Sequence, residues 1–109
     1  MHKIIAAAIL IALVLAVLAS PSMAEARTPC ETISGLAGTI MEARQSGVPM
    51  AKLMEHAAKA GTLNARRTAE GLIMTAYGQP RYQTPSIVQR EIEDFRDEAH
   101  LACLRKGSD

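Results

Sequence analysis

The stretch TPCETISGLAGTIMEARQSG, residues 28–47, predicts a helix whose start and end are both marked. Thr28 is a good N-cap residue, Pro29 suits the first helical turn, and Glu31 is placed to complete a capping box. Gly47 is a common residue just beyond a helix end. Between these ends, apolar residues recur at helical spacing and predict one buried face, which contains Cys30, Ile33, Ala37, Ile40 and Met41.

Two shorter helices are expected in the middle of the chain. The first begins at Pro49 and ends before Gly61, and the second begins at Thr62 or Asn64 and ends at Gly78. Both carry an apolar stripe at helical spacing, formed by Met50, Leu53, Met54, Ala57 and Ala58 in the first and by Ala69, Leu72, Ile73, Ala76 and Tyr77 in the second.

The last helix repeats the opening pattern of the first. It begins with Thr84-Pro85 and runs to about Lys106, before Gly107. Acidic side chains cover most of its surface, which is typical of a solvated face, and its expected buried stripe is Val88, Ile92, Phe95, Ala99, Ala102 and Cys103. No segment alternates with period two, so we expect an all-α bundle of about four helices.

The first 24 residues have the layout of a secretory signal peptide. A short basic start is followed by an uninterrupted apolar run at 4–19 and by small residues before a cleavage site after Ala24. Cleavage after Ala26 and retention as an anchor are the alternatives, although the apolar run is shorter than the roughly 20 residues of a spanning helix. We therefore expect residues 1–24 to be the signal and residues 25–109 to be one helical domain, periplasmic or secreted.

Export would place the two cysteines in an oxidising compartment, where disulfides persist. Cys30 lies in the first turn of the first helix and Cys103 in the last turn of the fourth, each on an apolar stripe. If these helices run antiparallel, the cysteines meet in a disulfide and Ile33 lies near Ala99. The alternatives are an intermolecular disulfide, reactive thiols, and a metal site formed by the two cysteines with His56 and His100.

The charge balance argues against two classes of partner, namely nucleic acids and anionic membranes. Lys3 is the one basic residue in 1–24, so eleven of the 12 lysines and arginines remain in 25–109 against 11 acidic residues. A net charge of zero disfavours binding to nucleic acid, which requires a basic excess, and adhesion to an anionic membrane. No nucleophile, phosphate-loop or metal-ligand motif is present, so we expect no enzyme activity, no cofactor and no metal site.

The connection between the last two helices is the candidate contact surface. It places Tyr77, Pro80, Arg81 and Tyr82 within six residues. Tyrosine and arginine dominate binding hot spots, and proline lowers the entropic cost of presenting them. The alternative is a rigid turn whose tyrosines pack on the core.

Two segments carry a resemblance to known proteins. Residues 30–50, with MEARQ followed by GVPM, and AYGQP at 76–80 before an acidic helix that ends in Cys103, resemble small exported two-cysteine helical proteins of proteobacteria and their phages. This group has no established activity, so the resemblance implies an architecture for most of residues 30–105. The overall plan is also similar to that of acid-activated periplasmic chaperones and of phage-encoded periplasmic inhibitors of lysozyme or of lysis timing.

We therefore expect a non-enzymatic interaction module that binds another protein in the periplasm. One alternative is an acid-stress chaperone that exposes its methionine-containing stripe at low pH, where the acidic residues lose their charge. Another is an inhibitor of a periplasmic enzyme such as lysozyme.

Overall fold

The computed structural model describes residues 28–107, so the predicted signal segment and its cleavage positions lie outside the described residues. Within 28–107 the chain forms four helices and no strand: α2 (Pro29–Gln45), α3 (Met50–Ala57), α4 (Leu63–Tyr77) and α5 (Pro85–Arg105). This confirms the all-α fold class. None of these four helices is both long and apolar enough to cross a membrane.

The helix starts follow from local hydrogen bonds. At the start of α2, the Thr28 hydroxyl accepts from the Glu31 amide at 3.2 Å, and the Glu31 carboxylate accepts from the Thr28 amide at 3.3 Å. At the start of α4 the cap is Thr62, whose hydroxyl accepts from the Ala65 amide at 3.0 Å. Thr84 is the N-cap of α5, but its side chain makes no capping hydrogen bond.

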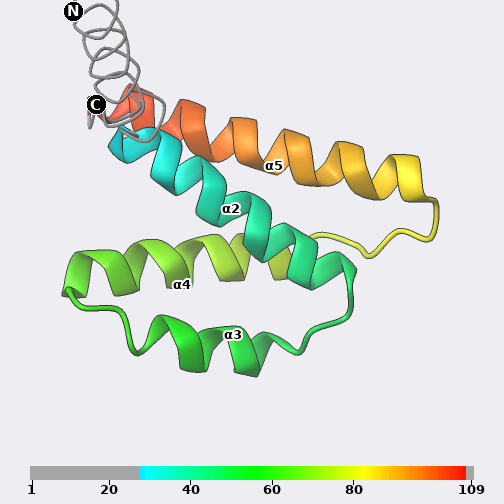
Figure 1. Ribbon diagram of the computed structural model, residues 1–109, viewed down its shortest axis with the longest axis horizontal. Coiled ribbons are helices and arrows are strands. Elements are labelled where there is room, and N and C mark those ends of the chain that lie inside the picture. Colours follow the sequence, from blue (N-terminus) through cyan, green and yellow to red (C-terminus); the bar gives the residue numbers. More distant parts are fainter. Residues whose placement is uncertain (1–27, 108–109) are drawn as a thin grey trace, which may run out of the picture.

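Helices α2 and α5 lie antiparallel and are joined by the Cys30–Cys103 disulfide, as the sequence predicts. Further along, the Ser34 hydroxyl donates to the carbonyl of Arg96 at 3.2 Å, which continues the same antiparallel register. Figure 1 shows the two helices converging at the disulfide end and separating toward the start of α5.

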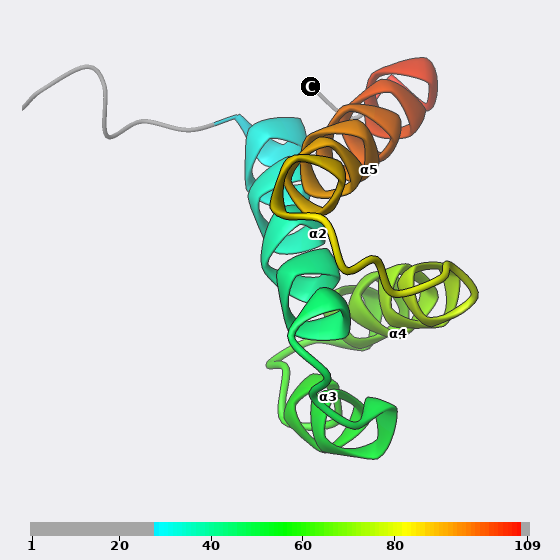
Figure 2. The same ribbon diagram turned by 90° about the vertical axis from the view of Figure 1, so that its right-hand side faces the viewer.

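Helix α2 is the centre of the bundle. It packs against α5 and α4, and α3 packs on α4. Figure 2 shows α5 and α4 on the same side of α2, with α3 beneath α4 at the edge of the fold. The middle pair of helices is therefore attached mainly through α2 and not sandwiched evenly between the terminal helices.

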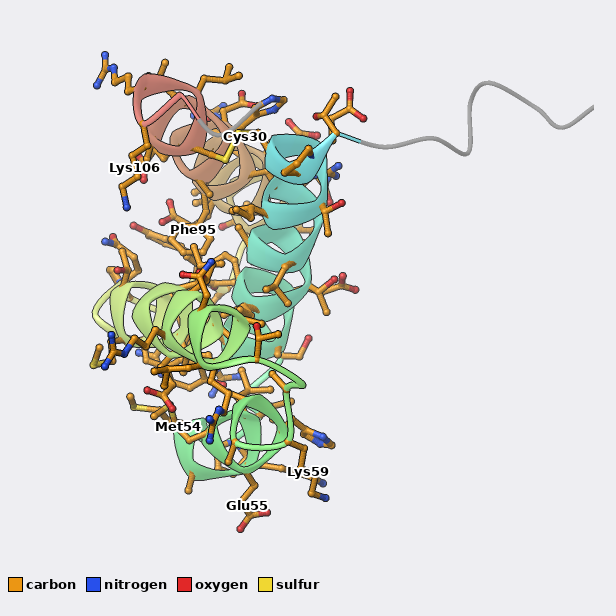
Figure 3. The ribbon with its side chains drawn as sticks, turned by 90° about the vertical axis from the view of Figure 1, so that its left-hand side faces the viewer. Cys30, Met54, Glu55, Lys59, Phe95 and Lys106 are labelled. Atoms are coloured by element: carbon orange, nitrogen blue, oxygen red, sulfur yellow. A yellow bond between two sulfur atoms is a disulfide. The ribbon has the colours of Figure 1, made fainter. Side chains whose placement is uncertain are left out.

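The buried core consists mostly of small and aliphatic side chains, namely Ala37, Ile40, Met41, Ala57, Ala69, Ile73, Ala76, Phe95 and Ala99. Phe95 is the one aromatic side chain in this set, and Figure 3 shows it reaching from α5 into the space above α4. Phe95 thus fills space between α5 and α4, the two helices that pack on α2.

Three members of the expected stripes are exposed instead. Met50 lies on α3 and Ala58 directly follows it, and this helix is covered by a neighbour on one side alone because it stands at the edge of the bundle. Ala102 lies on α5 where that helix faces the open space toward α4. Met41 is fully buried and Met54 packs against the core, so these two methionines fill the interior.

Candidate functional site

The connection between α4 and α5, residues 78–84, is fastened to the C-terminal end of α2 by side chains of that helix, and Gln45 makes the central contacts. Gln45 lies in the last turn of α2 and is buried, with 7% of its surface exposed. Its Nε2 donates to the carbonyl of Pro80 at 2.8 Å, and its Oε1 accepts from the amide of Tyr82 at 2.8 Å. The amide group thus holds the backbone on both sides of residue 81, and we call residues 78–84 the clamped connection.

Arg44 fixes the beginning of the clamped connection. Its Nε and Nη2 both donate to the carbonyl of Gln79, at 3.1 and 3.0 Å. The same guanidinium lies 5.2 Å from the ring centroid of Tyr77, within the range of a cation–π contact. The Tyr77 hydroxyl donates to the carbonyl of Val48, so this ring is held at its face and at its tip.

Arg81 lies over the turn that ends α2. Its Nε donates to the carbonyl of Gln45 at a long 3.4 Å, and its guanidinium would stand 3.0–3.2 Å from a Cβ built on Gly47. Gly47 has a φ of 84°, a conformation that favours glycine, and its missing side chain leaves room for the arginine. Within residues 28–107 no carboxylate forms an ion pair with Arg81 or Arg44.

The structure therefore brings together all four residues predicted for the contact surface. Tyr77 and Tyr82 are half-buried, whereas Pro80 and Arg81 are exposed. Both sequence interpretations describe part of this arrangement, because the turn is rigidly anchored and its tip still faces solvent.

The anchoring residues Arg44 and Gln45 were missed by the sequence interpretation. One signal was available for Gln45, which stands four residues after Met41 and so continues the apolar face of its helix. A polar side chain on a buried face needs hydrogen-bond partners. The chain supplies them from a segment 35 to 37 residues away, a distance that no local pattern reveals.

The cysteines form the second predicted site. Cys30 and Cys103 are bonded with a Cα–Cα distance of 5.5 Å, and both are buried. Because each sulfur is bonded to the other, neither is available as a metal ligand or as a nucleophile. In the described part of the chain no cluster of three or more His, Cys, Asp or Glu residues is arranged to hold a metal ion.

Several hollows lie elsewhere on the surface, and two of them contrast in the polarity of their lining. A polar one of about 580 Å³ separates α2 from α5 and is lined by Glu31, Ser34, Glu93, Arg96, Asp97 and His100. The Ser34 hydroxyl in this hollow donates its proton to the backbone carbonyl of Arg96. The other, an apolar groove of about 420 Å³, lies between α2, α3 and α4.

Comparisons with known protein families, with curated proteins and with solved structures found no match.

Proposed function

We propose that this protein is a non-enzymatic interaction module of the periplasm or the extracellular space, and that it binds another protein through the clamped connection. The observation that supports this most strongly is the pair of hydrogen bonds from Gln45 to Pro80 and Tyr82. They fix the backbone of residues 80–82 before any partner arrives. Preorganisation lowers the entropic cost of association, because fewer degrees of freedom are lost on binding.

The charge of the clamped connection supports a partner with an acidic surface. Arg81 is exposed, and Arg44 lies beneath it at the same end of α2. Neither has a carboxylate partner within residues 28–107. An acidic group on a partner could therefore pair with Arg81 without displacing an internal ion pair, while Tyr82 and Pro80 supply apolar contact area.

The environment proposed here rests on the disulfide and on the predicted signal segment. A disulfide with both sulfurs buried is compatible with an oxidising compartment. The export signal and its cleavage remain predictions, which the N-terminal sequence of the purified protein would test.

Affinity capture from a periplasmic extract tests the role of the clamped connection. The bait is the oxidised protein as wild type, Arg81→Ala and Tyr82→Ala, with Arg90→Ala as a matched control because Arg90 is exposed on α5. We expect one partner to be recovered by wild type and Arg90→Ala and to be depleted at least ten-fold by the other two variants. Equal recovery of every protein by all four baits would reject the proposed surface.

Inhibition of a periplasmic enzyme is a more specific form of the same proposal. It is favoured by an exposed arginine on a rigid connection, since glycoside hydrolases such as lysozyme carry catalytic carboxylates in an open cleft. Lysozyme activity measured with and without an excess of the protein tests this form. Unchanged activity at every ratio removes lysozyme as the target and leaves the capture experiment to identify another.

A further inference from the structure

The apolar groove is walled by three helices, α2, α3 and α4. Nine of its eleven lining residues are apolar, and the exceptions are Thr39 and His56. Its floor is the hydrophobic core itself, because Ile40, Ala57 and Ile73 are buried and line it. Leu36, with 38% of its surface exposed, stands at the mouth. A groove with apolar walls and few polar groups is typical of a small-molecule site.

We infer that this groove binds a single-chain amphiphile with an anionic head, namely a long-chain carboxylate. The size of the groove favours such a ligand. At roughly 30 Å³ per carbon, about the volume of a water molecule, a groove of about 420 Å³ that is open to solvent on one side accommodates a chain of at most about 14 carbons. An α-helix is about 10 Å across with its side chains, so the volume of the groove equals that of roughly one helical turn. The groove is therefore better matched to an alkyl chain than to a docked helix.

The charge at the rim favours an anionic head group. His56 lines the groove. Lys52 stands one turn before it on α3, and Lys59 lies in the turn that follows this helix, so both lysines are placed beside the groove and not in its lining. Both lysines are exposed and have no ion-pair partner within residues 28–107. The acidic residue of this helix, Glu55, falls on the side of α3 away from Leu53 and the groove, and Figure 3 shows Glu55 and Lys59 projecting in different directions.

Thr39 does not compete for the head group as a donor. Its hydroxyl already donates to the carbonyl of Gly35 at 3.2 Å. Recognition of a carboxylate therefore falls to His56 and Lys52 on α3 and to Lys59 in the turn after it. An alkyl chain lying over Ile40 and Ile73 would place its carboxylate within the reach of these flexible basic side chains.

Calorimetric titration with n-alkyl carboxylates of 8 to 16 carbons, each kept below its micellar concentration, tests the match in size. Burying one methylene is worth about a four-fold gain in affinity. We expect that gain per carbon up to about 14 carbons and a plateau beyond. No binding at any length, or an affinity that does not depend on length, would overturn the inference.

A groove-filling variant tests the location. Ala65 is exposed and lines the groove from α4, so Ala65→Phe should occupy the space without disturbing the core. The matched control is Ala51→Phe, because Ala51 is exposed on the side of α3 away from the groove. With unchanged helical signal and melting temperature in both, we expect at least a ten-fold loss of dodecanoate affinity in Ala65→Phe alone. Wild-type affinity in Ala65→Phe, or equal losses in both, would contradict the assignment.

Head-group dependence tests the role of the rim charges. Dodecanoate should bind several-fold more tightly than dodecyltrimethylammonium, and the difference should shrink in a Lys52→Gln, Lys59→Gln double variant. Equal binding of the two probes by wild type would overturn the anionic preference. Arg81→Ala should leave dodecanoate binding unchanged, so a failure of the clamped connection as a protein-binding surface can be told apart from a failure of this inference.

A second copy of the chain is the competing occupant. Sedimentation at increasing concentration should show no association that Ala65→Phe abolishes. A dimer that depends on Ala65 and persists with saturating dodecanoate would assign the groove to self-association and overturn the inference.

Discussion

Gln45 and Tyr82 are joined by a hydrogen bond of 2.8 Å between the Tyr82 amide and Gln45 Oε1, although 37 positions separate them in the sequence. The other end of the same amide group binds the carbonyl of Pro80. One buried side chain of α2 therefore bridges residues 80 and 82 of the connection between α4 and α5. The candidate contact surface depends on a residue that is itself not part of that surface.

Removing this amide should cost stability. Gln45→Ala leaves the Pro80 carbonyl and the Tyr82 amide without their partners in a half-buried setting, for which we expect a loss of about 2–3 kcal/mol in the free energy of unfolding. The matched control is Gln89→Ala, whose side chain makes an exposed hydrogen bond to Glu93 on α5. Denaturant unfolding measures both. A loss in Gln45→Ala no larger than that of the control would show that the clamp contributes little.

The disulfide should stabilise the fold by restricting the unfolded chain. It closes a loop with a sequence separation of 73, for which loop entropy gives about 4 kcal/mol as an upper value. We expect reduction to lower the denaturant midpoint and to raise the intact mass by two hydrogen atoms. A Cys30→Ala, Cys103→Ala double variant should show no response to reductant. Two titratable thiols in the untreated native protein would contradict the bond.

Gly71 offers a stabilising substitution. It lies inside α4, and a Cβ built on it has no neighbour within 4 Å. Gly71→Ala should therefore raise the free energy of unfolding by up to about 1 kcal/mol, the difference in helix propensity. Gly38→Ala is the informative comparison, because its Cβ would stand 2.6 Å from Cδ of Arg96. Thermal unfolding should place Gly38→Ala clearly below Gly71→Ala, and the reverse order would contradict the packing of α2 on α5.

Gly47 should be sensitive to substitution for a different reason. Its φ of 84° disfavours any side chain, and a Cβ would also crowd Arg81. We expect Gly47→Ala to lose about 1–2 kcal/mol of stability. Gly61→Ala should be nearly neutral, since its φ is not positive and nothing lies within 4 Å of its Cβ position. Equal melting temperatures for the two variants would argue against the left-handed backbone conformation at Gly47.

Much of the fold could be predicted from the sequence because its signals are local. Thr28 and Glu31 lie within one turn of each other, so their capping box is visible without knowledge of the rest of the chain. The disulfide is a long-range feature, yet it could be predicted because Cys30 lies at the start of the first described helix and Cys103 at the end of the last. Antiparallel packing of those helices then follows from a single bond.

The candidate site was predicted less completely. The tip residues Pro80 and Arg81 could be proposed from residue type alone, whereas the anchor Gln45 acts through contacts that depend on how α2 and the connection meet. The apolar groove was missed because its walls come from three helices. Periodicity assigns Ile40 and Leu53 to buried faces but does not show where the neighbouring helices leave a gap between them.

Site-specific photo-crosslinking tests most directly whether the clamped connection is a protein-binding surface. A photoreactive amino acid would replace Gln83, which is exposed in the clamped connection and leaves Arg81 in place, and a second variant would carry it in place of Asp94, which is exposed on α5. We predict a discrete crosslinked partner from position 83 that is absent from position 94 and reduced by Gln45→Ala. No product from position 83, or the same products from both positions, would contradict this role.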